Sequence, residues 1–224
     1  MFTLDQVVPW GRSFDEYRRM FALTETDLGL RIVGCGDGPA SFNAEATRRG
    51  ARVVSCDPIY RWAAAQIRER IAATCDEVLD QTRRNAEEFV WGDTIRSVEE
   101  LGHLRMTAMR RFLDDFEPGR VAGRYVAAEL PALPFADAAF ALALCSHVLF
   151  LYSGRLGEVF HHAAIREMCR VAAEVRMAAG YHVSLEPVPY EFQRGGNQMM
   201  RICRGERTDG SGALRPAAAQ RSVN

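Results

Sequence analysis

The chain contains no lysine: all 28 basic residues, set against 29 acidic ones, are arginines. This absence excludes the lysine of P-loop nucleotide sites, the strand lysine of protein kinases, lysine Schiff-base chemistry and Ser-Lys hydrolases. The formal net charge is −1, so no global field favours nucleic acid or an anionic membrane. We expect a small molecule or another protein as the partner.

Paired cysteines and long apolar runs are also missing. The six cysteines include no C-x-x-C pair, so neither a metal site nor a disulfide framework is predicted. The longest apolar stretch, residues 140–152, is interrupted by Ser146 and His147 and is too short to span a bilayer. The first residues have neither the basic nor the apolar region of a signal peptide. We expect a soluble, cytoplasmic protein.

What the sequence does contain is a strand–turn–helix–strand pattern. A short apolar run, residues 28–33, leads into the glycine cluster Gly34-Cys35-Gly36-Asp37-Gly38. Pro39 suits the first turn of a helix, which we expect to begin near it. Residues 52–56 then predict a second strand, closed by Asp57. This order predicts a βαβ unit with a parallel sheet.

The next sixty residues interrupt that pattern. Residues 61–120 are rich in Ala, Arg and Glu with helical periodicity, and a crossover needs only about a dozen residues. We interpret them as a helical insertion between the second and third strands. Phe89, Trp91 and Phe112, with Trp62 at its start, form either a lid over the site or, as we favour, the core of a helical subdomain.

The sheet pattern then resumes, with strands expected at residues 124–128 and 140–145 and a helix at 156–172. Only residues 177–180 separate Arg176 from the next extended segment. We therefore expect the fifth strand and its following helix to be shortened near residues 174–180.

Two extended segments close the folded part. Residues 181–192 and 197–203 flank Arg194-Gly195-Gly196 and predict a hairpin. Residues 204–224 have too few large apolar side chains to pack, so we expect a disordered tail.

The glycine cluster has the spacing G-x-G-x-G. Pro39 stands where the dinucleotide fingerprint needs Gly or Ala, which disfavours a nicotinamide oxidoreductase. This loop, Asp57 and the Leu-Pro-Phe-Ala-Asp stretch at residues 133–137 resemble the class I S-adenosylmethionine-dependent methyltransferases. The resemblance covers residues 28–152. It implies one domain over residues 1–203, a Rossmann-like three-layer α/β sandwich with a mostly parallel sheet and an antiparallel C-terminal hairpin.

The resemblance also implies where S-adenosylmethionine binds. The glycines let backbone approach the cofactor, Asp57 is placed to accept hydrogen bonds from two ribose hydroxyls, and Glu129 stands at the acidic position that often meets the adenine amino group. Ile32 replaces an acid that many members carry in the first strand. The expected cofactor-binding residues are Gly34, Cys35, Gly36, Gly38, Asp57, Pro58, Glu129, Leu130 and Ser146.

Candidates for catalysis follow the fourth strand. His147 is either a general base that removes a proton from the methyl acceptor or a residue that only packs against the cofactor. Tyr152 either closes over the site or belongs to the core. Arg12, Arg18 and Arg19 are candidates for the cofactor carboxylate. His161-His162 are interpreted as a solvated helix face.

The predicted function is methyl transfer from S-adenosylmethionine to an unidentified small-molecule or protein acceptor. The alternative is an S-adenosylmethionine-binding protein without turnover, because Ile32 and the shortened region after Arg176 each remove an expected element.

Overall fold

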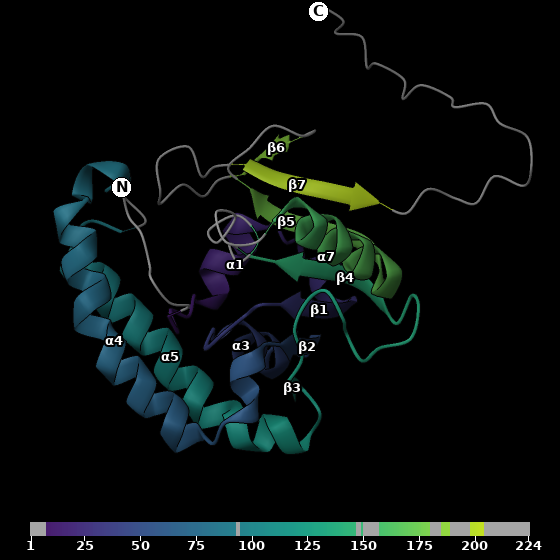
Figure 1. The fold of residues 1–224 in the computed structure, drawn as a ribbon, viewed down its shortest axis with the longest axis horizontal. Helices are drawn as coiled ribbons and strands as arrows, with labels where there is room; N and C mark the ends of the chain where they lie inside the picture. The colour runs from purple at the N-terminus through teal and green to yellow at the C-terminus, as the bar shows by residue number, and fades with distance from the viewer. Residues whose placement is uncertain are drawn as a thin grey trace, which may run out of the picture.

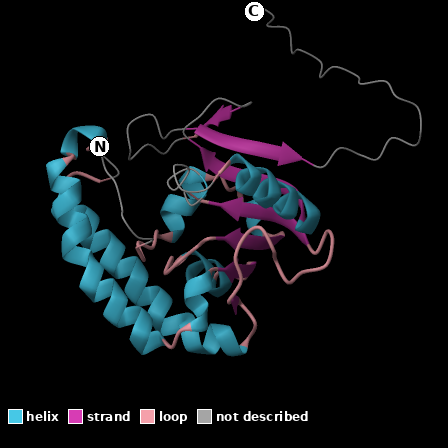
Figure 2. Ribbon diagram, viewed as in Figure 1, coloured by secondary structure: helices cyan, strands magenta, loops and turns pink. Residues whose placement is uncertain are grey.

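A mixed seven-stranded sheet forms the centre of the protein (Figures 1 and 2). The computed structural model describes residues 8–92, 95–146, 149, 157–179, 185–188 and 198–203. The strand order is β3-β2-β1-β4-β5-β7-β6, and the first five strands in that order are parallel. They are β1 (Arg31–Cys35), β2 (Arg52–Cys56), β3 (Tyr125–Val126), β4 (Phe140–Cys145) and β5 (Ala172–Ala179). The prediction of an α/β fold with a parallel sheet is confirmed.

The last two strands run against their neighbours. β7 (Gln198–Cys203) pairs antiparallel with β5, and β6 (Leu185–Pro187) pairs antiparallel with β7. The turn predicted at residues 194–196 and the tail predicted at residues 204–224 lie outside the described residues.

The strand order reverses at β1, which has β2 on one side and β4 on the other. In open α/β sheets this reversal leaves a crevice beyond the carboxyl ends of the strands, where ligands bind. β1, β2 and β4 end in register there, because Cys35 is the pairing partner of both Cys56 and Cys145. The glycine cluster follows β1 at this edge.

Helices cover both faces of the sheet. α1 (Phe14–Met20), α2 (Glu25–Leu28) and α3 (Phe42–Arg48) pack with Ile32 and Leu144 on one face. α7 (Glu158–Val171) packs with Val33 and Ala143 on the other (Figure 1). Successive strand residues alternate between the two clusters, as the pleat requires, and the sheet is therefore buried on both sides.

α1 begins at a capping box. Ser13 caps the helix with its side chain, and the Glu16 side chain accepts a hydrogen bond from the Ser13 backbone N–H. Tyr17 and Met20 on the same helix are buried against the sheet.

The insertion between β2 and β3 is helical. After the 3₁₀ turn η1 (Pro58–Arg61), α4 (Ala64–Arg84) and α5 (Val98–Val121) lie side by side as a long pair (Figure 1), with the 3₁₀ turn η2 (Ala86–Glu88) between them in sequence. Phe112 and Phe89 are buried. Trp62 and Trp91 are partly buried against apolar clusters, so core packing describes these aromatics.

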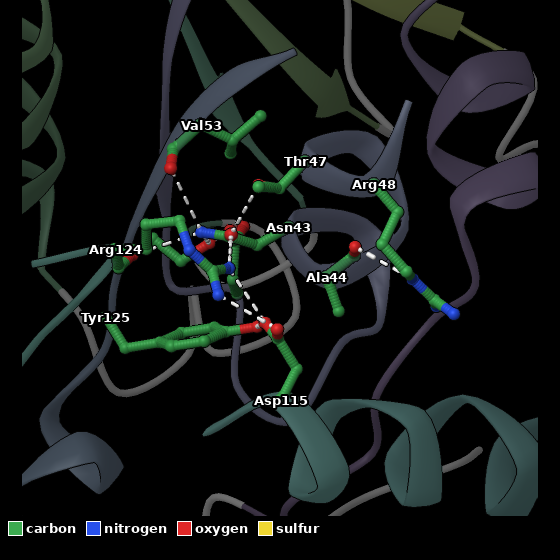
Figure 3. Close-up of polar contacts among 10 residues, drawn as sticks. Asn43, Ala44, Thr47, Arg48, Val53, Asp115, Arg124 and Tyr125 are labelled. Atoms are coloured by element: carbon green, nitrogen blue, oxygen red, sulfur yellow. Dashed lines mark hydrogen bonds and ion pairs between the residues drawn. The ribbon is translucent and has the colours of Figure 1, made fainter. Parts of the chain in front are cut away.

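A polar cluster fastens α5 and β3 to the rest of the fold (Figure 3). Asp115 accepts a bidentate pair from Arg124 at 2.7 and 2.8 Å and a hydrogen bond from the Tyr125 hydroxyl at 2.9 Å. Arg124 also donates to the Asn43 side chain on α3. The insertion is thus held to the sheet edge by charge-assisted contacts as well as by its aromatic core.

The expectation of a shortened fifth strand is wrong. β5 is eight residues long and pairs with β4 from Ala172 to Met177. Its two charged residues, Glu174 and Arg176, interrupt the apolar pattern that predicts a buried strand. The strand tolerates them because Arg176 is buried and forms ion pairs with Asp27 and Glu174. Residues 180–184, which separate β5 from β6, lie outside the described residues.

In the part of the chain that the structure describes, no helix is long and apolar enough to cross a membrane.

Candidate functional site

The glycine loop after β1 turns sharply at the switch-point edge. Gly36 and Gly38 have φ values of 70° and 53°, in the left-handed region that favours glycine. The Gly36 N–H donates to the Cys56 carbonyl oxygen at 2.8 Å, which ties the turn to the end of β2. The loop is therefore fixed by its own backbone beside the carboxyl end of the neighbouring strand.

Asp57, directly after β2, closes against this loop. Its Oδ2 accepts from the Gly38 N–H at 2.8 Å, and its Oδ1 accepts from the Ile59 N–H at 2.9 Å. The Tyr60 hydroxyl donates to the Gly38 carbonyl oxygen at 2.7 Å. Each carboxylate oxygen can accept a second hydrogen bond. Among the described residues, each Asp57 oxygen thus accepts one backbone hydrogen bond and has the capacity for one more.

Asp37 turns into the protein instead of toward a ligand. Its carboxylate accepts from the Tyr17 hydroxyl at 2.9 Å and from the Ser55 hydroxyl at 2.5 Å. A Cβ added to Gly34 would lie 1.9 Å from the Asp37 Oδ2. The space of the missing Gly34 side chain therefore holds the Asp37 carboxylate, and the role of Gly34 in cofactor binding stays a prediction.

The polar contacts of Asp37 extend to the next elements. The Asn43 side-chain amide donates to the Ser55 hydroxyl at 3.2 Å and to the Arg124 carbonyl oxygen at 3.0 Å (Figure 3). On the other side, the Tyr17 hydroxyl of α1 donates to Asp37. The network thus joins α1, the glycine loop and the carboxyl end of β2.

Burial dominates the electrostatics of this edge. It raises the pKa of Asp37 to about 6, although the hydrogen bonds from Ser55 and Tyr17 act to lower it. Burial likewise raises the pKa of Asp57 to about 6, against the hydrogen bonds of Ile59 and Gly38, and the charge of Glu129 adds to the rise. The site therefore presents acidic groups whose charge changes close to neutral pH.

Among the three candidate arginines, Arg12 lies against the glycine loop. Its carbonyl oxygen accepts from the Ser41 N–H at 3.0 Å. A Cβ on the preceding Gly11 would lie 2.1 Å from the Pro39 carbonyl oxygen. The Arg12 Nε is buried and has no hydrogen-bond partner among the described residues. Its positive charge acts to lower the pKa values of Glu16 and Tyr17 on α1.

The other two arginines lie elsewhere. Arg18 pairs with Glu25 at 3.1 Å and lines a cavity of about 290 Å³ beside Leu28 and Ala51, which precede β1 and β2. Arg19 donates from its Nε to the Asp15 carbonyl oxygen. Arg18 therefore lies at the amino ends of the strands, away from the glycine loop.

The contact of Arg12 with Ser41 also corrects the expected helix start. α3 begins at Phe42 rather than near Pro39. The N-terminal segment binds the backbone of residues 39–41, which would otherwise form the first turn. No ligand contact is therefore assigned to the amino end of this seven-residue helix.

The remaining predicted cofactor residues occupy different surroundings. Cys35 is buried in the apolar cluster under α7, so its side chain faces away from the edge. Pro58 begins η1, and Glu129 is exposed but near enough to raise the pKa of Asp57. Leu130 is buried in the same cluster as Cys35. His147 and Tyr152 lie outside the described residues, so the role of His147 stays a prediction.

The two histidines of α7 differ from each other. His162 is exposed, as expected of a solvated helix face. His161 instead places Nε2 2.6 Å from the Leu149 carbonyl oxygen and Nδ1 3.0 Å from that of Gly157. It thus links the start of α7 to the segment after β4.

Comparison with known proteins gives one relative over nearly the whole length. The chain is 30% identical over 223 residues to "Uncharacterized protein MJ0045" of Methanocaldococcus jannaschii, an alignment covering 90% of this chain and 98% of that protein. The chain belongs to the MJ0045 family. No family model matches it.

Among solved structures, the chain is similar to magnesium protoporphyrin IX methyltransferase (ChlM) from Synechocystis PCC 6803, solved with bound SAM. The TM-score is 0.40 and the identity 13%, over 86% of this chain and 91% of that one. Membership of the MJ0045 family does not by itself assign an activity. The function of this member must therefore be argued from its site.

Sequence reasoning missed the residues that hold the loop from behind, namely Tyr17, Asp37, Asn43, Ser55 and Tyr60. The sequence did give one indication for Asp37, namely its position between Gly36 and Gly38, which both have positive φ in the structure. It gave none for Tyr17, because its partner is 20 residues away and only the packing of α1 brings them together.

Proposed function

We propose that this protein binds S-adenosylmethionine at the glycine-loop edge and transfers its methyl group to a small-molecule or protein acceptor. The observation that carries the proposal is the pairing of Gly38 with Asp57. A left-handed glycine turn after β1 and a buried carboxylate after β2 meet at 2.8 Å at the switch point of the sheet. This arrangement suits a ligand with a ribose diol and a polar chain lying along backbone.

The remaining acceptor capacity of Asp57 favours a ribose. Its carboxylate is oriented by two backbone N–H groups, so the hydroxyls of a bound ribose meet a preformed acceptor pair. Arg12 supplies a guanidinium that can pair with the carboxylate in the methionyl part of the cofactor. Its buried Nε without a partner supports that role.

The acidic edge also suits the charge of the ligand. Bound S-adenosylmethionine supplies an electrophilic methyl group on a sulfonium cation. Asp37 and Asp57 provide negative charge nearby without a lysine, and Arg12 lies on the side of α1. The acceptor side begins at Ser146, where His147 is the candidate base for the acceptor proton. Alignment of the acceptor with the methyl group is the main contribution that we assign to the protein.

The alternative of binding without turnover loses part of its support. It depended on Ile32 and on a shortening of the fifth strand and its following helix, and the strand β5 is present over eight residues. Only residues 180–184 lie between β5 and β6. Ile32 remains, fully buried in the core. A nicotinamide oxidoreductase is still disfavoured by Pro39, which replaces the third small residue of that fingerprint.

Titration calorimetry with S-adenosylmethionine, S-adenosylhomocysteine and NADH tests the proposal. We expect the two adenosyl ligands to bind and NADH not to bind. Asp57→Asn keeps the volume but replaces one acceptor oxygen with a donor, so affinity should fall about tenfold or more. Asp115→Asn is the matched control: it removes a carboxylate held by Arg124, away from the loop, and should bind normally.

Binding of NADH alone, or unchanged affinity of Asp57→Asn, would overturn the assignment. Turnover is measured as S-adenosylhomocysteine formed with pools of candidate acceptors. Tight binding of S-adenosylmethionine without turnover in any pool would favour the non-catalytic alternative.

A further inference from the structure

The inward-facing carboxylate of Asp37 has no role in the ligand contacts above. It is buried, it fills the space behind Gly34, and it accepts hydrogen bonds from Tyr17 and Ser55. The flanking residues Gly36 and Gly38 face the edge through their backbone. Asp37 therefore fastens the loop from inside, at the residue between the two left-handed glycines.

Tyr17 brings α1 to this point. Its ring is stacked on Phe42 with centroids 4.6 Å apart and meets the edge of Phe21 at 5.4 Å. Those contacts already fill the space around the ring. Its hydroxyl donates to Asp37 in the glycine loop at 2.9 Å. The hydroxyl thus joins α1 to the glycine loop.

Stability alone does not explain this arrangement. A buried carboxylate whose partners are neutral hydroxyls costs more than an apolar group of the same size. Burial raises the pKa of Asp37 to about 6, which is the signature of that cost. Costly polar groups of this kind are characteristic of functional sites.

We propose that Tyr17 is a positioning residue, whose hydroxyl holds the glycine loop through Asp37 in the conformation that binds the cofactor. The proposal rests on the proposed function for the identity of the ligand, but the positioning itself can be measured without ligand.

The test variant is Tyr17→Phe, which keeps the ring and removes the hydroxyl. Tyr125→Phe is its matched control, because Tyr125 is also buried and also donates to a carboxylate, that of Asp115, at 2.9 Å. We expect Tyr17→Phe to weaken S-adenosylmethionine binding about tenfold, equivalent to about 1.4 kcal/mol. Tyr125→Phe should lower the unfolding temperature to a similar degree and leave the affinity unchanged.

Hydrogen exchange of the ligand-free protein separates this proposal from the function. The Gly36 and Gly38 N–H groups are both hydrogen-bonded, at 2.8 Å each. In Tyr17→Phe we expect their exchange to accelerate about tenfold while the amides of β4 keep wild-type rates. Tyr125→Phe should leave all of them unchanged. If the wild type binds no S-adenosylmethionine, the proposed function fails and this exchange experiment still decides the role of Tyr17.

A pH profile gives a further measurement, which a change in packing alone would not shift. Because the Tyr17 hydrogen bond lowers the pKa of Asp37, its removal should move upward the pH at which the contribution of Asp37 to the free energy of unfolding is lost. Tyr125→Phe should not move it. The titratable groups around Asp37 are Tyr17, Asp57, Tyr60, Cys35, Cys56 and Cys145.

The action of Tyr17 through Asp37 is tested by a double-mutant cycle on affinity. Asp37→Asn and Tyr17→Phe should be non-additive, because the two side chains share one hydrogen bond. If Tyr17→Phe unfolds, Asp37→Asn keeps the volume and should show the same loop exchange. Wild-type exchange at Gly36 and Gly38 in the folded variant, with wild-type affinity, would overturn the proposal.

Discussion

Gly38 and Asp57 are joined across 19 residues by a hydrogen bond from the Gly38 N–H to the Asp57 carboxylate at 2.8 Å. The Tyr60 hydroxyl fixes the other side of the same residue, by donating to the Gly38 carbonyl oxygen. The glycine turn and the end of β2 therefore form one rigid unit. Substitutions in this unit should alter ligand affinity more than the free energy of unfolding. Substitutions of the buried residues that contact the inner side of the loop should alter both.

Replacing Arg12 should weaken binding of a ligand that carries a carboxylate. In Arg12→Gln the charge is lost while most of the stem is kept, and we expect S-adenosylmethionine affinity to fall about tenfold. Calorimetry with 5′-methylthioadenosine, which lacks the amino acid part, gives the decisive contrast, since its affinity should not change. Arg18→Gln is the control, because Arg18 pairs with Glu25 at the other edge. Equal losses for both ligands would contradict a carboxylate contact.

Gly34→Ala should destabilise the protein because of Asp37. The new Cβ would lie 1.9 Å from Oδ2 and 2.5 Å from Cγ of Asp37, so the carboxylate must leave its position. Urea unfolding should show a loss of about 1–3 kcal/mol. The double variant Gly34→Ala/Asp37→Ala should be more stable than Gly34→Ala alone.

Gly92→Ala is the control for that series, because nothing lies within 4 Å of its added Cβ. A double variant no more stable than Gly34→Ala would mean that backbone, rather than the Asp37 side chain, is what Gly34 accommodates.

The pH dependence of stability has a definite sign at this site. Asp37 and Asp57 both have a pKa of about 6 in the folded protein, raised by burial above the ordinary aspartate value of 3.8, so between these values the folded state binds more protons than the unfolded state. Their contribution to the unfolding free energy is therefore largest below about pH 4 and falls as the pH rises through about 6. Urea unfolding across this range should show a smaller decline in Asp37→Asn than in the wild type.

Ligand affinity should change in the opposite direction. Ionised Asp57 is the better acceptor for ribose hydroxyls and the better neighbour for a sulfonium, so S-adenosylmethionine should bind more tightly as the pH rises through about 6. Calorimetry at several pH values measures this directly. Affinity that is constant across the range would contradict an ionised Asp57 in the complex.

The parts of the fold that follow local patterns were predictable. β2 and β4 have the predicted bounds, because each is an apolar run closed by a polar or glycine-containing turn. The full length of β5 was missed because Arg176 interrupts its apolar pattern. The ion pairs of this buried arginine with Glu174 and with Asp27, 149 residues away in sequence, satisfy its charge inside the sheet.

In the candidate site too, some residues could be predicted from local sequence patterns and others could not. Asp57 and the glycine turn were found from spacing, since a motif and a strand end suffice to place them. Tyr17 and Ser55 were not found, because hydroxyls that satisfy a buried carboxylate can come from any element that packs nearby. Arg12 was one of three equivalent candidates until the contacts of Gly11 and Arg12 with residues 39 and 41 separated it from the others.

Breaking the ion pair between Arg105 and Glu16 should test how the insertion supports the site. Arg105 on α5 is 1% exposed and pairs with Glu16 on α1, one residue before Tyr17. Burial acts to raise the pKa of Glu16, but the charge and hydrogen bond of Arg105 outweigh it and, with Arg12, lower the pKa to about 2. Glu16 therefore stabilises the fold above about pH 4.5, and that contribution is lost as the pH falls toward 2.

Arg105→Met should cost about 3–5 kcal/mol in urea unfolding at neutral pH, because it leaves a buried carboxylate without its cation. The acid limb of the stability profile should move to higher pH, since the pKa of Glu16 is no longer held down. Adding Glu16→Gln should recover part of the loss. Because α1 also carries Tyr17, Arg105→Met should accelerate exchange at Gly36 and Gly38, linking the insertion to the glycine loop; normal exchange there, together with lower stability, would confine the insertion to a structural role.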